Sequence, residues 1–230
     1  MGALSSAAPM PAVQAINDRT SAALGAEAVR MCAARVAKVT GTHALLLDGM
    51  AHIRLGTPEG VACVTTLRRA PEGADWRGSL RAEPVELPFG DGAFCLVCAY
   101  FPGLGGVLPE PLAGELARVL SVHGTLLVVD VHPVALWHAP SSSPWRWQRA
   151  LRGAGLQVAA AVRFGSPWPR ARGTDGLPRW MVQLLGGGWL LAARRRPEAG
   201  ATVLRPAFAG RRVREPATLL PGAGAHRQRA

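Results

Sequence analysis

The sequence of 230 residues has a single lysine, Lys38, so arginine carries nearly all of its positive charge. Lysine and arginine together number 26 against 15 acidic residues, which gives a formal charge of +11. Because 27 glycines and 19 prolines accompany the arginines, the composition indicates a GC-rich coding background more than a nucleic-acid signature. The charge alone therefore identifies no partner. Hydrophobic residues make up 49% of the chain, so we expect most of it to fold.

Long apolar runs are also missing. No stretch approaches the ~18 uninterrupted apolar residues that a membrane span needs. Residues 1–19 lack a basic segment followed by a hydrophobic run, which is the pattern of a secretory signal. We therefore expect a cytoplasmic protein that has no membrane span and is a monomer.

Cysteine is scarce, and its spacing does not build a metal site. Cys95 and Cys98 form a CxxC, but the apolar run around them predicts a strand, in which residues three apart face opposite sides. The sequence has no second CxxC and no histidine at zinc-finger spacing. We predict no bound metal, and reduced, buried thiols of the kind found in the cytoplasm.

Two common catalytic motifs are absent. A dinucleotide-binding oxidoreductase needs Gly-x-Gly-x-x-Gly directly after its first strand, and no such motif stands there. A serine hydrolase of the common type needs Gly-x-Ser-x-Gly, which does not occur. Hydrolase chemistry is thus unsupported, and the oxidoreductase remains only a third candidate.

Apolar runs alternate with amphipathic segments along the chain. The predicted strands span residues 44–47, 61–66, 80–85, 94–101, 125–131, 156–163 and 188–193. Helices are predicted at about 17–40, 111–120 and 145–153, because apolar side chains recur there on one face. This alternation predicts an α/β fold: a single Rossmann-like domain with a mostly parallel central sheet and helices on both faces.

The composition changes near the end of the chain. Residues 194–230 hold nine arginines and only two acidic residues, without sustained periodicity. We divide the chain into an N-terminal helical extension (1–40), an α/β domain (41–196) and a disordered basic tail (197–230). Such a tail could bind nucleic acid or another acidic surface.

Residues 81–131 carry a family pattern. Glu83 stands shortly before Leu-Pro-Phe at residues 87–89, and a turn containing Asp91 leads into the apolar run at 94–101. A helix ending in Glu-x-x-Arg-Val-Leu follows at residues 115–120, and Gly124 precedes the next apolar run. In this order and spacing the segment resembles class I S-adenosylmethionine-dependent methyltransferases. The resemblance is to type 11-like proteins of a divergent bacterial branch, whose domain also ends in an Ala-Arg-Arg-like strand and a basic tail.

The resemblance implies S-adenosylmethionine as cofactor and an unidentified methyl acceptor as substrate. Glu83 is the implied acceptor for the adenine amino group, with Pro84 and Val85 against the adenine. Tyr100 would border the methyl group, where an aromatic face can attract a sulfonium cation. An alternative for Tyr100 is an ordinary core or lid aromatic. In an open α/β sheet such a ligand lies beyond the carboxyl ends of the strands.

The start of the domain departs from the family pattern. Asp48 and Gly49 supply the acidic residue and one glycine expected after the first strand, and are the implied cofactor contacts there. Met50, His52 and Arg54 then fill positions where the family has a glycine-rich loop, so this loop is degenerate. The second strand lacks the acidic residue that holds the ribose hydroxyls, since the polar residues at 64–69 are threonines and arginines.

Two functional hypotheses follow. The first is an S-adenosylmethionine-dependent methyltransferase with no identified catalytic residue, because methyl transfer relies on positioning and an electrophilic methyl group. The second is a catalytically inactive methyltransferase-fold protein that serves as a binding or scaffold module with a basic tail. Asp130 and His132 follow an apolar run, but beside Pro133 they indicate a turn more than an acid–base pair.

Overall fold

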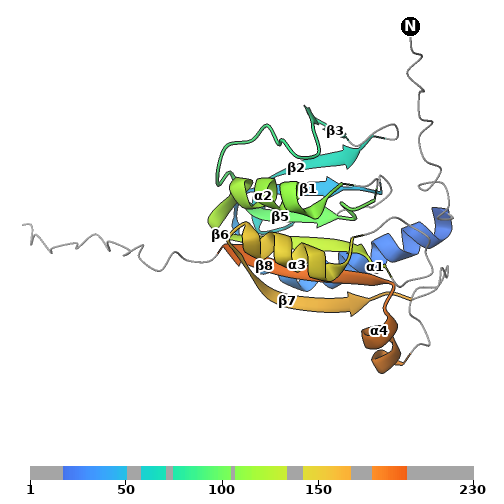
Figure 1. Cartoon of the computed structure of the whole chain (residues 1–230). Helices are drawn as coiled ribbons and strands as arrows, with labels where there is room; N and C mark the ends of the chain where they lie inside the picture. Colours follow the sequence, from blue (N-terminus) through green and yellow to red (C-terminus); the bar gives the residue numbers. More distant parts are fainter. Residues whose placement is uncertain are drawn as a thin grey trace, which may run out of the picture. The chain divides into compact units, whose positions relative to one another are not determined.

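The computed structural model describes residues 18–50, 58–70, 75–104, 107–133, 142–166 and 178–195. The predicted tail at 197–230, residues 1–17 of the N-terminal extension and most of the degenerate loop lie outside these residues. The described residues form four helices and eight strands (Figure 1). The helices are α1 (Asp18–Val36), α2 (Pro109–Val119), α3 (Pro144–Gly153) and α4 (Arg179–Leu185). The strands are β1 (Gly41–Asp48), β2 (Val61–Arg69), β3 (Trp76–Gly78), β4 (Arg81–Ala82), β5 (Phe94–Tyr100), β6 (Leu120–Val131), β7 (Leu156–Phe164) and β8 (Gly188–Arg195).

Most elements match the predicted segments, and the short ones do not. The apolar runs correspond to β1, β2, β5, β6, β7 and β8, with ends that differ by a few residues. The strand predicted at 80–85 is reduced to β4. Neither β3 nor α4 was predicted, because three and seven residues are too few to show a period.

All eight strands belong to one sheet in the order β4-β3-β2-β1-β5-β6-β8-β7. The prediction of a mostly parallel sheet is wrong: among the described residues three pairings are parallel and four are antiparallel. The parallel pairs, β2–β1, β1–β5 and β5–β6, form the centre, and the antiparallel pairs extend both sides. The antiparallel pairing of β2, β3 and β4 follows in part from their short connections. A parallel pair needs a crossover of a dozen or more residues, and too few residues separate these strands.

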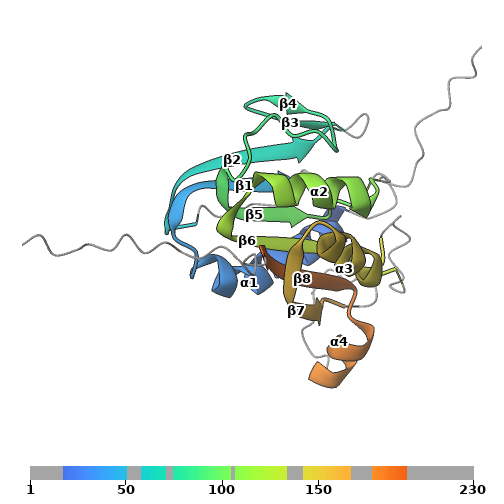
Figure 2. The same cartoon turned by 60° about the vertical axis from the view of Figure 1, so that its left-hand side comes forward.

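Helices cover both faces of the sheet, as predicted (Figures 1 and 2). On one face Leu112 and Leu116 of α2 and Trp147 of α3 pack with apolar side chains of the sheet. On the other face Leu24 and Cys32 of α1 pack with a second buried cluster. Burial of these two apolar faces supplies the main favourable free energy of folding.

The strand ends converge on one edge of the sheet. β1, β2, β5 and β6 run in parallel, and β4 has the same direction after two antiparallel steps. The strand order reverses between β1 and β5, since β1 leads to β2 on one side and β5 to β6 on the other. Ligands of open α/β sheets bind outside the carboxyl ends at such a reversal. We call this rim, with residues 48–49, 69, 82–83, 100–103 and 130–132, the carboxyl edge.

Candidate functional site at the carboxyl edge

Asp48 and Gly49 end the first strand at the carboxyl edge. The Asp48 side chain is fully buried; its Oδ1 accepts a hydrogen bond from the Met50 amide at 3.0 Å, and its Oδ2 lies 3.9 Å from Nε of Arg68. The Gly49 amide donates to the Tyr100 carbonyl at 2.8 Å. A Cβ at Gly49 would stand 2.1 Å from the Phe101 carbonyl oxygen, so only glycine allows this close approach of β1 to β5.

Tyr100 is directed to the α1 face of the sheet. It is buried, and its hydroxyl makes hydrogen bonds with the thiols of Cys32 in α1 and Cys98 in β5. Burial raises the pKa of Tyr100 and of Cys98, and raises the pKa of Cys32 to about 11, so all three are neutral at physiological pH. This trio lines a cavity of about 320 Å³ under α1.

The chain turns sharply after Tyr100. Phe101 is fully buried and has a φ of 51°, in the left-handed region that residues other than glycine rarely occupy. Its amide donates to the Val129 carbonyl at 2.6 Å, which holds this conformation in place. This strained backbone shows that the chain adopts a specific, unfavourable conformation at the carboxyl edge, as is common near functional sites.

Glu83, Pro84 and Val85 form an exposed turn directly after β4. Glu83 is exposed, Pro84 is half-buried and Val85 is 41% exposed. The Glu86 amide donates to the Glu83 carbonyl at 3.4 Å, which closes the turn. Because Ala82 pairs with Trp76 and Trp76 pairs with Arg69, Glu83 lies one residue beyond the level of Arg69. The structure thus brings Glu83 to the same edge as Asp48 and Gly49.

Arg118 of α2 fastens the segment that follows this turn. Its guanidinium donates to the carbonyls of Leu87 and Phe89 at 2.8 and 2.7 Å, and to Asp91 at 2.8 Å. It also bonds Glu115 at 2.7 and 2.9 Å, and Glu115 accepts from the Leu87 amide at 3.0 Å. The Arg118 contact holds the pKa of Glu115 below its usual value. The Glu-x-x-Arg pattern therefore positions the 87–91 loop against α2.

Arg69 is a site residue that sequence reasoning did not single out. It ends β2, is 7% exposed, and stacks on Trp76 with its Cζ 4.7 Å from the ring centroid. Its Nη2 donates to the Pro102 carbonyl, beyond the end of β5, at 2.9 Å. Since β1 lies between β2 and β5, the Arg69 side chain crosses the end of β1. The sequence signal was only an arginine in place of the expected acid.

Asp130 is the buried carboxyl group on the other side of the strand reversal. It is fully buried at the end of β6, accepting from the Gly103 amide at 3.1 Å and from the Val131 amide at 2.8 Å. Burial raises its pKa to about 7, although these amides and the charge of Arg69 oppose the rise. His132 is also largely buried, and burial lowers its pKa. Both side chains are therefore buried at the edge, directly before the turn at Pro133.

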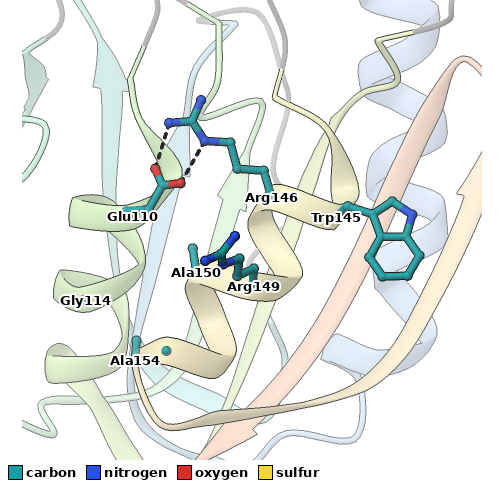
Figure 3. Close-up of a pocket in the computed structure, with 8 residues that line it drawn as sticks. Glu110, Gly114, Trp145, Arg146, Arg149, Ala150 and Ala154 are labelled. Atoms are coloured by element: carbon teal, nitrogen blue, oxygen red, sulfur yellow. Dashed lines mark hydrogen bonds and ion pairs between the residues drawn. The ribbon is translucent and has the colours of Figure 1, made fainter.

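A separate groove of about 1020 Å³ lies between α2 and α3 (Figure 3). Arg146 of α3 bridges Glu110 of α2 through two hydrogen bonds of 2.8 and 3.1 Å at one end of it. Figure 3 shows Trp145 pointing away from α2. None of the sequence-predicted site residues lines this groove, so the carboxyl edge remains the candidate site.

The described residues give no sign of a metal centre. They contain no cluster of three or more histidine, cysteine, aspartate or glutamate side chains suited to a metal ion. Cys32, Cys63, Cys95 and Cys98 are all free thiols, but the prediction that they are buried is wrong for Cys63, which is exposed, and for Cys95, which is half-buried. No helix within the described part of the chain has the length and apolar character of a membrane span.

The fold is that of S-adenosylmethionine-dependent methyltransferases. An example from Listeria monocytogenes assigned to this class superposes with a TM-score of 0.51 at 10% identity, covering 76% of this chain and 98% of its own. A Thermotoga maritima methyltransferase described as a possible histamine N-methyltransferase gives 0.50 at 16% identity, covering 77% and 91%. No family model and no curated protein matches the sequence. At such low identity the likeness defines the fold alone.

Proposed function

We propose that the protein is an S-adenosylmethionine-dependent methyltransferase that binds its cofactor at the carboxyl edge. The observation that carries the proposal is the strand register, which brings Asp48, Glu83, Arg69 and Asp130 to one edge at the strand reversal. The sequence features at residues 81–131, whose order and spacing resemble those of class I methyltransferases, support the proposal independently. The methyl acceptor remains unassigned.

The groups at this edge fit the chemistry of the cofactor. The cofactor carries an adenine amino group, an α-carboxylate, an α-ammonium and a sulfonium. Glu83 offers an exposed carboxylate acceptor beside the apolar surface of Pro84 and Val85. Nε and Nη1 of Arg69 are buried N–H groups with no hydrogen-bond partner among the described residues, and an anionic acceptor would satisfy them. The acid expected at the end of β2 for the ribose is replaced by Arg69.

When bound, the cofactor supplies an electrophilic methyl group on a cationic sulfur. The protein's contribution is to hold the ligand and acceptor in position. Glu83 would accept from the adenine amino group, and Gly49 would hold the end of β1 against β5 beside the ligand. Tyr100, directed to the α1 face with Cys32 and Cys98, would support the end of β5 from beneath.

We further propose that the protein belongs to a type 11-like bacterial branch of methyltransferases, is cytoplasmic and is a monomer. The free cysteines are consistent with a reducing compartment. If the cofactor does not bind, the second hypothesis, an inactive methyltransferase-fold binding module, takes precedence.

Calorimetric titration of the full chain with S-adenosylhomocysteine tests the proposal. We expect saturable binding, weakened about 10-fold by Glu83→Ala, because one charge-assisted hydrogen bond is lost. Glu86→Ala is the matched control, since Glu86 is an exposed carboxylate in the same turn. Absence of binding to the wild-type chain at millimolar ligand would refute the proposal. Equal weakening by both variants would remove the role assigned to Glu83.

A further inference from the structure

The Arg69 guanidinium is fixed at the point where the strand order reverses. Trp76 stacks against it, and the Pro102 carbonyl accepts from Nη2. These two contacts orient the planar group above the end of β1. A guanidinium held in this way loses little side-chain entropy when it binds a further group. Arg69 is therefore a preorganised hydrogen-bond donor.

Two of its N–H groups have no acceptor in the described part of the chain. Nε and Nη1 are buried and make no hydrogen bond there. Buried donors are nearly always satisfied, because leaving one unpaired costs free energy. The unpaired Nε and Nη1 of Arg69 are consistent with a hydrogen-bond acceptor that does not belong to the described helices and strands.

The charge of Arg69 is also only partly balanced. Burial lowers its pKa to about 10, so it remains a cation at neutral pH. No ion pair joins it to a carboxylate among the described residues. The charge of Asp130 acts on Arg69, but with its pKa at about 7 this carboxyl group is only partly ionised at neutral pH. An additional anion near Arg69 would neutralise its remaining positive charge.

We propose that Arg69 binds a carboxylate group of the ligand through its open guanidinium N–H groups. This inference rests on the proposed function, within which the carboxylate is that of the cofactor's amino-acid part. A guanidinium only donates hydrogen bonds, and each of its two edges, Nε with Nη2 and Nη1 with Nη2, presents a pair of N–H groups that matches the two oxygens of a carboxylate. The ribose hydroxyls, which prefer an acidic acceptor, are a poorer match. The Pro102 contact brings the guanidinium toward the end of β5 and away from Glu83.

The test compares two ligands that differ only in this group. S-adenosylhomocysteine and its decarboxylated analogue are titrated calorimetrically into the wild-type chain, Arg69→Gln and Arg69→Lys. We expect the wild-type chain to prefer the carboxylate ligand by about 10- to 100-fold, because charge-assisted hydrogen bonds are lost with the analogue. In Arg69→Gln the preference falls to within about threefold. Arg69→Lys keeps the charge without the paired donors and gives an intermediate preference.

The outcomes separate the two proposals. Equal affinity of the wild-type chain for both ligands overturns the role of Arg69 and leaves the cofactor proposal intact. The same holds for a preference that persists in Arg69→Gln. If neither ligand binds the wild-type chain, both proposals fail. Arg77→Gln, an exposed arginine of β3, is the control for a general effect of charge, and the wild-type ligand pair remains decisive even if an Arg69 variant does not fold.

Discussion

Replacement of Asp130 by asparagine will flatten the pH dependence of stability. Asp130 is fully buried, and burial raises its pKa from 3.8 to about 7. In the unfolded chain the same carboxyl titrates near its ordinary value. Between these two pKa values the folded protein therefore binds more protons than the unfolded chain, and the free energy of unfolding falls as the pH rises.

The magnitude follows from the separation of the two pKa values. Each step of one in pKa corresponds to about 1.4 kcal/mol, so full ionisation of Asp130 costs the folded state about 4 kcal/mol. The stabilising contribution is complete below pH 3.8 and is lost by about pH 7. About 3 kcal/mol of the change falls between pH 5 and pH 8.

Asparagine removes the ionisation and part of the hydrogen bonding. Its single carbonyl oxygen can accept from either the Gly103 or the Val131 amide, while its NH₂ group meets the other donor. The lost hydrogen bond costs about 1–3 kcal/mol at every pH. We therefore expect the stability of Asp130→Asn relative to the wild-type chain to rise by about 3 kcal/mol from pH 5 to pH 8, and the variant to be the more stable protein at pH 8.

Urea unfolding followed by tryptophan fluorescence, at intervals from pH 5 to pH 8, measures this difference. The lowered pKa of His132 acts in the opposite sense, because stability from a histidine held neutral is lost as the pH falls. His132 is present in both proteins, so its contribution largely cancels in the difference. Parallel pH profiles for the two proteins would refute the assignment of a raised pKa to Asp130.

Two further pairs of variants test the framework of the site, with the free energy of urea unfolding as the measurement. Arg118→Ala will destabilise the protein by about 2 kcal/mol, because two loop carbonyls lose their donor, while Arg146→Ala on an exposed bridge changes little. Similar losses for both would contradict the fastening role of Arg118. Gly49→Ala will cost about 2 kcal/mol or more, since its Cβ meets the Phe101 carbonyl, whereas Gly114→Ala, open in α2, gains up to about 1 kcal/mol. A tolerated Gly49→Ala would show that β1 and β5 can separate at this edge.

The short uninterrupted apolar runs made the centre of the fold predictable. Residues 94–100 and 125–131 are buried on both faces, and such strands show as uninterrupted hydrophobic stretches. The antiparallel flanks were not predictable in the same way. β3 and β4 contain three and two residues, and their pairing depends on contacts with β2 that no local pattern encodes.

The candidate site, too, was only partly predictable from the sequence. That Glu83 follows a strand and stands near Leu-Pro-Phe is visible in the sequence, and the structure brings it to the carboxyl edge. The direction of the Tyr100 ring was not visible. Alternation along β5 defines two faces, but only packing against Cys32 of α1 decides which of them receives the phenol.

By itself the sequence determined that strands and helices alternate, and which residues follow each strand. It could not determine which strands are neighbours or the register in which they pair, because both depend on hydrogen bonds between segments far apart in the sequence. Arg69 is the clearest case. In the sequence it is an arginine where an acid was expected, with no indicated partner. The order β2-β1-β5 makes its side chain cross the strand reversal and meet the Pro102 carbonyl, leaving two buried nitrogens without a hydrogen-bond partner among the described residues.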